Sequence, residues 1–396
     1  MSAAGYLVTS VPLRLASAGS AVALPILAVQ RLDDVAVGAA LVAASLAPAV
    51  VAAPLAGVAL DRARRPRLLF FAAALVTVVA FAAGALIGTL PLWLIVVLLV
   101  GAGCAAPIYF GGLSSFATDA IPDENRAYAY DALSYNVASV AGPGLVAIIG
   151  TAGASGLGMW LMAGAALVGA AGALTMRATP RPVSGHGWVG TVAAGGRHLV
   201  GHAPLRLVIL TGTLAALGSG ALPIVAIGLS IERSGDVHQA ALIVTAFAVG
   251  GLAGAVLSAI RPGSRFTPQF VMAGGWAAIG LFTLLAVPDL GLVWTVVVIG
   301  ISGIFTASSN AAMLLLRKLN SPPGVRSQVF TIGSGLRAAS GALGAAIAGA
   351  AAGLDAGVLV VGIAASWLIP ALVMLAYRPA VSRTPRDGSS AESFAT

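Results

Sequence analysis

The chain has 396 residues, of which 59% are hydrophobic and only 9% are charged. Soluble domains carry about 25% charged residues, so a soluble enzyme and a soluble DNA-binding protein are both excluded. Its basic residues are scattered between apolar blocks, which excludes the continuous basic stripe that binds nucleic acid. Because one membrane-spanning helix needs about 20 apolar residues, this apolar content allows at most roughly twelve spans. The expected partner of most of this surface is therefore the lipid bilayer.

Apolar runs of 20 to 26 residues predict six spans in the first half of the chain, at 5–29, 36–60, 68–88, 92–115, 128–150 and 157–176. Six more are predicted at 205–229, 239–260, 268–287, 291–315, 327–352 and 356–376. The sequence thus predicts an all-α integral membrane protein with twelve transmembrane helices. Its parts are an N-terminal six-helix half (1–176), a cytoplasmic linker (177–204), a C-terminal six-helix half (205–380) and a disordered cytoplasmic tail (381–396).

The two halves resemble each other at an offset close to 200 residues. The segment 19–26 is similar to 218–224, and the turn 122–126 aligns with 322–326. Because each half has an even number of spans, both copies enter the membrane from the same side. This pattern predicts two pseudo-symmetric halves related by an axis along the membrane normal.

The basic residues predict the orientation, because cytoplasmic loops collect Lys and Arg. With the N-terminus inside, 17 of the 21 basic residues fall on the cytoplasmic side. The outer loops hold Arg31 and Arg233, while Arg14 and Arg337 lie within spans. We therefore expect a multi-pass protein of the cell membrane with both termini in the cytoplasm.

Several kinds of chemistry have no support in the sequence. The single lysine, Lys318, precedes Leu319, so the chain lacks the phosphate-binding loop of an ATP-driven pump. His198 and His202 share a helix face in the linker, but two ligands make only a weak metal site. The single cysteine, Cys104, is best explained by packing. We expect no catalytic residue, no metal and no cofactor, and therefore no enzyme.

The strongest local motif lies at the cytoplasmic end of the second span, from Gly57 to Arg65. It resembles the signature loop of the major facilitator superfamily, G-x-x-x-D-R-x-G-R-R. Gly57, Asp61, Arg62 and Arg65 match this pattern, and Arg64 replaces its second glycine. The resemblance extends over the whole chain through the twelve spans, the half-repeat and the central linker. It implies a secondary transporter that rocks two six-helix halves around a central site.

This loop is a candidate conformational gate. Gly57 allows two helix backbones to approach, and Asp61 can face the positive N-terminal end of a neighbouring helix. The resemblance implies that this neighbour is the eleventh span, and that Arg62 meets an acid at the end of the fourth span, for which Asp119 is the candidate. Such contacts would hold the halves together inside while the cavity opens outward. The alternative is a loop that only anchors the topology.

The fifth span contains Gly142 and Pro143, which resemble the core of the antiporter signature G-x-x-x-G-P-x-x-G-G. Proline removes one backbone hydrogen bond and glycine permits close packing, so the pair predicts a helix kink. In the family this signature is associated with exporters, and the resemblance therefore favours export.

Three charged residues lie inside predicted spans, namely Arg14, Asp131 and Arg337. Each costs about 2.5 to 3.5 kcal/mol near a helix centre and normally faces a partner or a cavity. Tyr135 and Asn136 add polar groups beside Asp131. We predict that Arg14 pairs with Asp131 and that this cluster lines the substrate or proton pathway. The alternative is a structural ion pair between helices.

The resemblance also implies that spans one, four, seven and ten line the cavity, which adds Tyr109 and Asn310 to the pathway candidates. Hydroxyl groups in these spans can instead satisfy the helix backbone. From these residues we expect a monomeric exporter of a small amphipathic compound, a drug or a metabolite, driven by protons. The alternatives are an importer or uniporter of a small metabolite, and a lipid-handling or signalling membrane protein.

Overall fold

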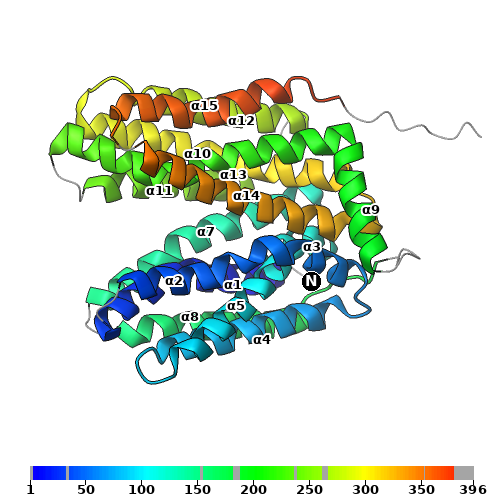
Figure 1. The fold of residues 1–396 in the computed structure, drawn as a ribbon. Coiled ribbons are helices and arrows are strands. Elements are labelled where there is room, and N and C mark those ends of the chain that lie inside the picture. The colour runs from blue at the N-terminus through cyan, green and yellow to red at the C-terminus, as the bar shows by residue number, and fades with distance from the viewer. Residues whose placement is uncertain are drawn as a thin grey trace, which may run out of the picture.

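The structure is a computed structural model that describes residues 3–378, apart from 33–34, 152–154, 182–187, 236–238, 261–265 and 352. Long helices run roughly alongside one another in two groups, which face each other across the middle of the molecule (Figure 1). The predicted tail 381–396 and the basic residues Arg261, Arg265, Arg383 and Arg386 lie outside the described residues.

The first group corresponds to the predicted N-terminal half. It contains α1 (Ala3–Leu32), α2 (Val35–Leu46), α3 (Pro48–Asp61), α4 (Pro66–Ala85), α5 (Leu92–Pro107), the π-helical turn η1 (Ile108–Gly112), α6 (Leu113–Ala120), α7 (Glu124–Thr151) and α8 (Ser155–Thr175). A separate helix, α9 (Trp188–Gly201), lies in the predicted linker.

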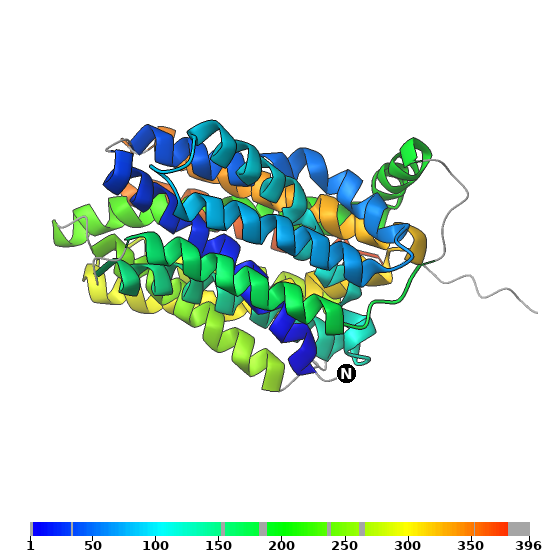
Figure 2. The same ribbon diagram turned by 90° about the horizontal axis from the view of Figure 1, so that it is seen from below.

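The second group contains α10 (Ala203–Ser234), α11 (Ala240–Ile260), α12 (Pro268–Leu284), α13 (Gly291–Leu319), the short η3 (Pro323–Val325), α14 (Arg326–Ala350) and α15 (Ala356–Met374). Helix α9 lies across one end of the bundle and packs against α3, α10 and α14, so it contacts both groups (Figures 1 and 2). We call this end of the bundle the linker side.

Within the described residues, nine helical segments are long and apolar enough to cross a membrane. The other predicted spans correspond to α12, which has 17 residues, and to α7 and α14, which carry charged side chains such as Asp131 and Arg337. Two predicted spans are interrupted. The second divides before Pro48, and the fourth contains η1 directly after Pro107, because proline removes a backbone hydrogen bond. The predicted all-α membrane architecture is confirmed.

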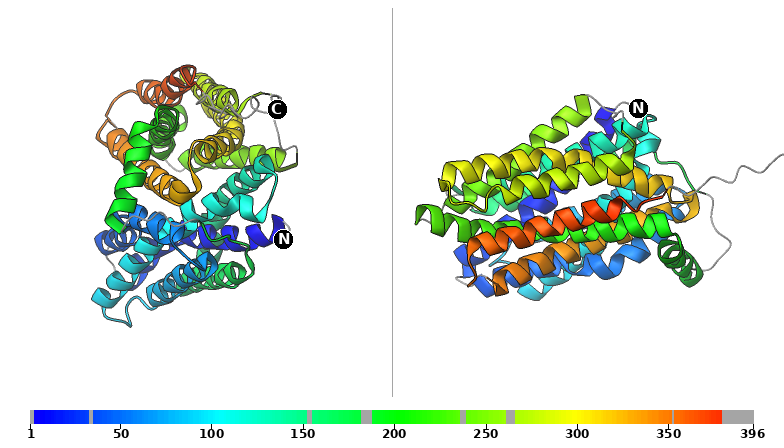
Figure 3. Two further views of the ribbon diagram at one scale, coloured as in Figure 1. Left: turned by 90° about the vertical axis from the view of Figure 1, so that its right-hand side faces the viewer. Right: turned by 90° about the horizontal axis from the view of Figure 1, so that it is seen from above.

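The two groups pack their helices in the same scheme. Helix α1 contacts α7 and α8, as α10 contacts α14 and α15, and α4 contacts α8 as α12 contacts α15. Between the groups, α3 packs against α14 and α7 packs against α11. In the end-on view the two groups lie one above the other, and these four helices form the interface between the groups (Figure 3). The packing thus repeats with the period that the sequence similarity predicts.

Small residues bring α1 and α7 into close contact. A Cβ atom built on Gly142 would lie 2.8 Å from the Gly19 nitrogen and 2.8 Å from the Leu15 carbonyl oxygen. Pro143 lies inside α7, which runs from Glu124 to Thr151, and the kink predicted for this pair stays a prediction. The glycine is therefore explained by the approach of two helix backbones.

We expect Gly142→Ala to destabilise the protein by about 1 to 3 kcal/mol, because the added methyl group meets backbone atoms that cannot move independently. Gly144→Ala is the matched control on the same helix, since its Cβ would have nothing within 4 Å. The measurement is thermal unfolding of both variants in the same detergent. Equal stability of the two variants would contradict the close approach.

Candidate functional site: a central cavity and its linker-side closure

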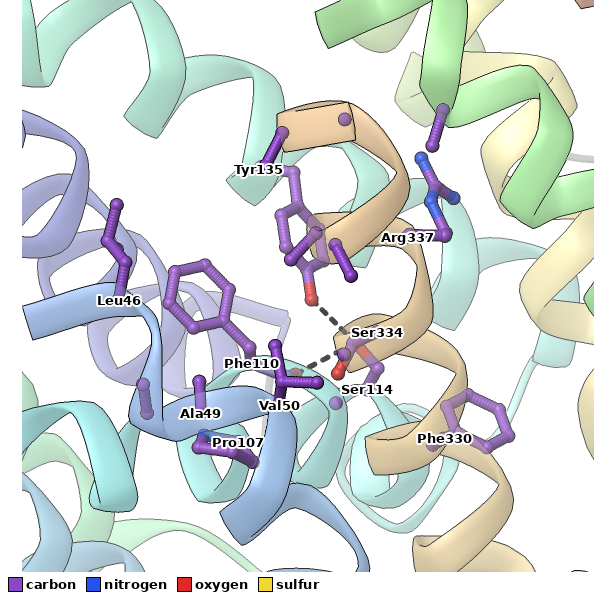
Figure 4. Close-up of a pocket in the computed structure, with 18 of the residues that line it drawn as sticks. Leu46, Ala49, Val50, Pro107, Phe110, Ser114, Tyr135, Phe330, Ser334 and Arg337 are labelled. Carbon is purple, nitrogen blue, oxygen red and sulfur yellow. Dashed lines mark hydrogen bonds between the residues drawn. The ribbon is translucent and has the colours of Figure 1, made fainter. Parts of the chain in front are cut away.

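A cavity of about 970 Å³ lies between the two groups of helices. Residues from α2, α3, α5, η1, α6 and α7 line it on one side, and residues from α10, α13 and α14 line it on the other. In the close-up, Leu46, Val50 and Phe110 lie on one side of the cavity and Ser334 and Arg337 on the other (Figure 4). Both halves therefore contribute to one site, and most of its lining is apolar.

A few polar side chains interrupt this apolar lining: Ser114, Tyr135, Ser219, Asn310, Arg317, Ser334 and Arg337. The Arg337 guanidinium donates a hydrogen bond to Asn310 Oδ1 at 2.9 Å and approaches the Met313 sulfur at 3.3 Å. Tyr135, Asn310 and Arg337 thus line the cavity, and their role in a substrate or proton pathway stays a prediction. The sequence reasoning missed Arg317 as a cavity residue, although it lies seven residues after Asn310 and thus on the same helix face.

The predicted pair of Arg14 and Asp131 is present and deeply buried. Arg14 Nη1 lies 2.6 Å from Asp131 Oδ1, and the two side chains are 1% and 0% exposed. Arg14 also donates to Ser134 Oγ, to Ser114 Oγ at 3.1 Å, and to the Phe110 carbonyl oxygen at 3.2 Å. The guanidinium carbon lies 3.6 Å from the centre of the Tyr135 ring. Through Ser114, Phe110 and Tyr135 the pair borders the cavity.

Tyr6 completes this network, and sequence reasoning missed it. Its buried hydroxyl donates a hydrogen bond to Asp131 Oδ1 at 2.6 Å. Tyr6 precedes Arg14 by eight residues, so both lie on one face of α1, and this spacing was the available signal. The second carboxylate oxygen, Asp131 Oδ2, is buried and has no hydrogen-bond partner within the described part of the chain.

The motif loop contacts the second half at the linker side. Asp61 is 2% exposed and accepts hydrogen bonds from the backbone N–H groups of Ser327 at 3.1 Å and Gln328 at 3.3 Å. These N–H groups belong to the first turn of α14, which is the eleventh predicted span. The carboxylate therefore faces the positive N-terminal end of this span, as expected. A Cβ on Gly57 would lie 2.5 Å from the Gln328 Cα atom. Glycine at position 57 is therefore required by the approach of α3 to α14.

A further cation, which the sequence analysis missed, joins this contact. Arg181 from the linker pairs with Asp61 Oδ1 at 3.0 Å and donates to Ser327 Oγ and to the Ser115 carbonyl oxygen at 2.6 Å. It is 8% exposed, and its guanidinium carbon lies 4.0 Å from the Phe116 ring centre. Burial lowers the pKa of Arg181, while the Asp61 carboxylate acts in the opposite direction. The sequence alone does not distinguish Arg181 from the other arginines of the linker.

Other contacts between the halves lie at the same end. Ser115 and Ser327 approach at 3.1 Å between their hydroxyl oxygens, and Lys318 forms an ion pair with Glu124. The rings of Tyr128 and Phe330 stack with centroids 6.2 Å apart. Together with Asp61 and Arg181 they form what we call the linker-side latch, which joins the two halves at the end of the bundle that carries α9.

The sequence matches the family model of the Major Facilitator Superfamily over residues 7–211, slightly more than half of the chain. The chain belongs to the major facilitator superfamily. It is a secondary transporter and a multi-pass membrane protein, and the superfamily consists of transporters, not enzymes. No curated protein matches the chain.

Solved structures of the superfamily share the fold. A bacterial homologue of the iron transporter ferroportin, in an outward-facing state, gives a TM-score of 0.71 at 16% identity, covering 95% of this chain and 98% of that chain. A human organic anion transporter gives 0.69 at 16% identity, covering 93% and 99%. The E. coli fucose:proton symporter gives 0.67 at 15% identity, covering 94% and 96%. At these identities the similarity establishes the fold alone.

Two predicted pathway residues of this transporter lie away from the cavity. The Tyr109 hydroxyl points between α1 and α4, 3.1 Å from Ser17 Oγ and 3.5 Å from Thr77 Oγ1. Asn136 donates to the Ala132 carbonyl oxygen at 2.8 Å and lies beside Gly251 of α11. Their helices were assigned correctly, but a π-helical turn rotates Tyr109 away from the cavity, and the register of α7 turns Asn136 toward α11.

The remaining gate candidates lie near the latch. Asp119 Oδ2 accepts a hydrogen bond at 2.8 Å from the backbone N–H of Thr179 in the linker. Asp119 therefore holds the linker segment that carries Arg181, and its predicted contact with Arg62 stays a prediction. Arg65 is exposed directly before α4, where it can act as a topological anchor.

Proposed function

We propose that this transporter exports a small amphipathic compound from the cell, using the central cavity as the substrate site. The observation that carries the proposal is the cavity itself, which has room for a drug-sized or metabolite-sized molecule and combines an apolar lining with a few polar groups. Both halves line it, so rocking of one half against the other can expose it to either side. We propose that a monomer suffices, because the two halves that face each other across the cavity belong to one chain.

The latch supports an alternating-access cycle. With the linker side in the cytoplasm, as the basic residues suggest, the latch corresponds to a state closed toward the inside. Opening inward then requires Asp61 to leave the N-terminus of α14 and Arg181 to leave Asp61 and Ser327. The gate residues Gly57, Asp61 and Arg181 thus set the balance between the two states.

We propose Asp131 as the proton site. Its Oδ2 atom is buried and free of hydrogen bonds within the described residues, while Oδ1 binds Arg14 and Tyr6. A proton on Oδ2 removes the negative charge that holds Arg14. The released guanidinium can then rearrange toward Ser114 and Tyr135 at the cavity wall. Proton binding and the shape of the cavity are thereby linked.

Consecutive residues of α6 join the proton site to the latch. Ser114 accepts a hydrogen bond from Arg14, and Ser115 contacts both Arg181 and Ser327. A shift of α6 after protonation of Asp131 would therefore act directly on the latch. This short connection supports coupling between protons and inward opening, and the resemblance of Gly142 and Pro143 to the exporter signature supports the outward direction.

The test is transport in inside-out membrane vesicles with an imposed pH gradient, acidic inside, using a panel of neutral, cationic and anionic fluorescent dyes. We expect accumulation of at least one dye in the vesicles, its loss on adding a protonophore, and its absence in Asp131→Asn. Tyr377→Phe, remote from Asp131, serves as the expression-matched control. Gradient-driven accumulation only in right-side-out vesicles would overturn export in favour of import.

The proposed orientation makes a separate prediction. After replacement of Cys104, a single cysteine at Arg197 on the exposed face of α9 should react with an impermeant thiol reagent only in inside-out vesicles. Cysteines at Asp289 and Asp355, which lie in loops at the opposite end, should react only in intact cells. Labelling of position 197 from outside would overturn the cytoplasmic placement of the termini and of the linker.

A further inference from the structure

Arg317 is a buried cation in the wall of the central cavity. Its side chain lines the central cavity and the residue is 1% exposed. The Nε and Nη2 atoms are buried and have no hydrogen-bond partner within the described part of the chain. A guanidinium has five N–H donors, and leaving them unpaired in a buried place is unfavourable. Such a group is expected to face a ligand.

The packing around Arg317 holds the guanidinium in place without neutralising it. A Cβ atom on Gly333 of α14 would lie 2.8 Å from Nη1, and a Cβ on Gly212 of α10 would lie 3.5 Å from Nη2. Two glycines on different helices thus leave room for the planar group between them. Arg317 also lies in the last turn of α13, where cations are favoured. Its unpaired Nε and Nη2 show that capping of the helix carbonyls does not account for the side chain.

A second cation, Arg337, lies in the same cavity. Arg337 donates a hydrogen bond to the neutral Asn310 and lines the same cavity as Arg317. Asp131 is paired with Arg14. The ion pairs among the described residues join Arg14, Arg181, Arg233 and Lys318 to acids, and none of them includes Arg317 or Arg337. The cavity therefore carries an excess of positive charge at one wall.

We infer that this wall binds the oxyanion head group of an amphipathic substrate, a carboxylate or a phosphate. The planar guanidinium fork matches both groups, and the dry surroundings strengthen the interaction. The apolar body of the substrate then lies along the opposite wall, where Leu46, Val50 and Phe110 face the cavity (Figure 4). The inference rests on the proposed function, since it assigns the substrate class to the same cavity.

Four probes with the same eight-carbon alkyl chain and different head groups test the inference: nonanoate, octyl phosphate, octylamine and octanol. Binding is measured by the thermal shift of the purified full-length protein in lipid nanodiscs. We expect nonanoate or octyl phosphate to bind at least tenfold more tightly than octylamine or octanol. A preference between the two anions distinguishes a carboxylate substrate from a phosphate substrate. Equal or tighter binding of octylamine, or no shift with either anion, overturns the inference.

Variants locate the binding groups. Arg317→Gln should weaken anion binding at least tenfold, and Arg317→Lys should weaken it less, because it keeps the charge but loses the fork. The control Arg126→Gln removes an equal charge from an exposed position on the linker side and should bind like the unmodified protein. Unchanged anion affinity in Arg317→Gln overturns the inference, and thermal unfolding without ligand shows that the variant is folded.

The experiments distinguish a failure of the anion site from a failure of the proposed proton-driven export. If the vesicles accumulate only cationic dyes in response to the pH gradient, proton-driven export stands and the anion site is overturned. If anions bind at Arg317 but no gradient drives any dye, the anion site stands and proton-driven export is overturned.

Discussion

Neutralising Asp131 alone should cost more stability than neutralising Asp131 and Arg14 together. Asp131→Asn leaves the buried Arg14 guanidinium without its counter-ion, and breaking a buried pair in this way typically costs about 3 to 5 kcal/mol. In the double variant Arg14→Gln/Asp131→Asn no charge remains to be stabilised. The double-mutant cycle, measured by thermal unfolding, should therefore give a coupling energy of about 1 to 3 kcal/mol.

Transport by the same variants separates a structural pair from a proton site. If Asp131 carries the coupling proton, the folded double variant loses its dependence on the pH gradient. Tyr6→Phe is the matched control, since it removes the hydrogen bond to Asp131 Oδ1 while both charges stay. We expect Tyr6→Phe to keep gradient-driven transport. Additive effects of the two single substitutions would contradict the pairing, and gradient dependence in the double variant would contradict the proton role.

Removal of Arg181 should open the linker side. The Arg181 side chain connects Asp61, Ser115 and Ser327 across the two halves, so Arg181→Gln deletes one ion pair and several charged hydrogen bonds at once. Charged hydrogen bonds in buried places contribute about 1.5 to 3 kcal/mol each. A loss of this size shifts the population toward the inward-open state by more than tenfold. Transport should fall while insertion and abundance stay near normal.

Asp61→Asn should act in the same direction, because the carboxylate that faces the N-terminus of α14 is lost. The measurement is the distance between spin labels at Arg67 and Thr267, which are exposed on the linker side in different halves. We expect longer distances in both variants than in the unmodified protein. Arg64→Gln is the control, since this exposed residue belongs to the same loop. Unchanged distances in Arg181→Gln would show that the latch does not hold the closed state.

The sequence by itself determined the helical membrane architecture and most of the individual spans. Runs of apolar residues long enough to cross a bilayer allow helices alone here, and their ends are marked by proline, glycine and charge. The same reasoning identified Arg14 and Asp131, because a charge within a span is costly and needs a partner. It also placed Asp61 opposite the eleventh span through the motif that Gly57 to Arg65 share with the superfamily.

Only the tertiary structure decided which side chains meet across the halves. In the sequence, Arg181 and Arg317 look like ordinary basic residues beside apolar segments. The burial of Arg181 depends on how the linker folds, and the burial of Arg317 depends on two glycines of other helices. Tyr109 and Asn136 belong to the expected helices, yet a π-helical turn and the register of α7 direct them away from the cavity. Spacing along one helix defines a face, but the neighbour of that face is set by the packing of segments more than 100 residues apart.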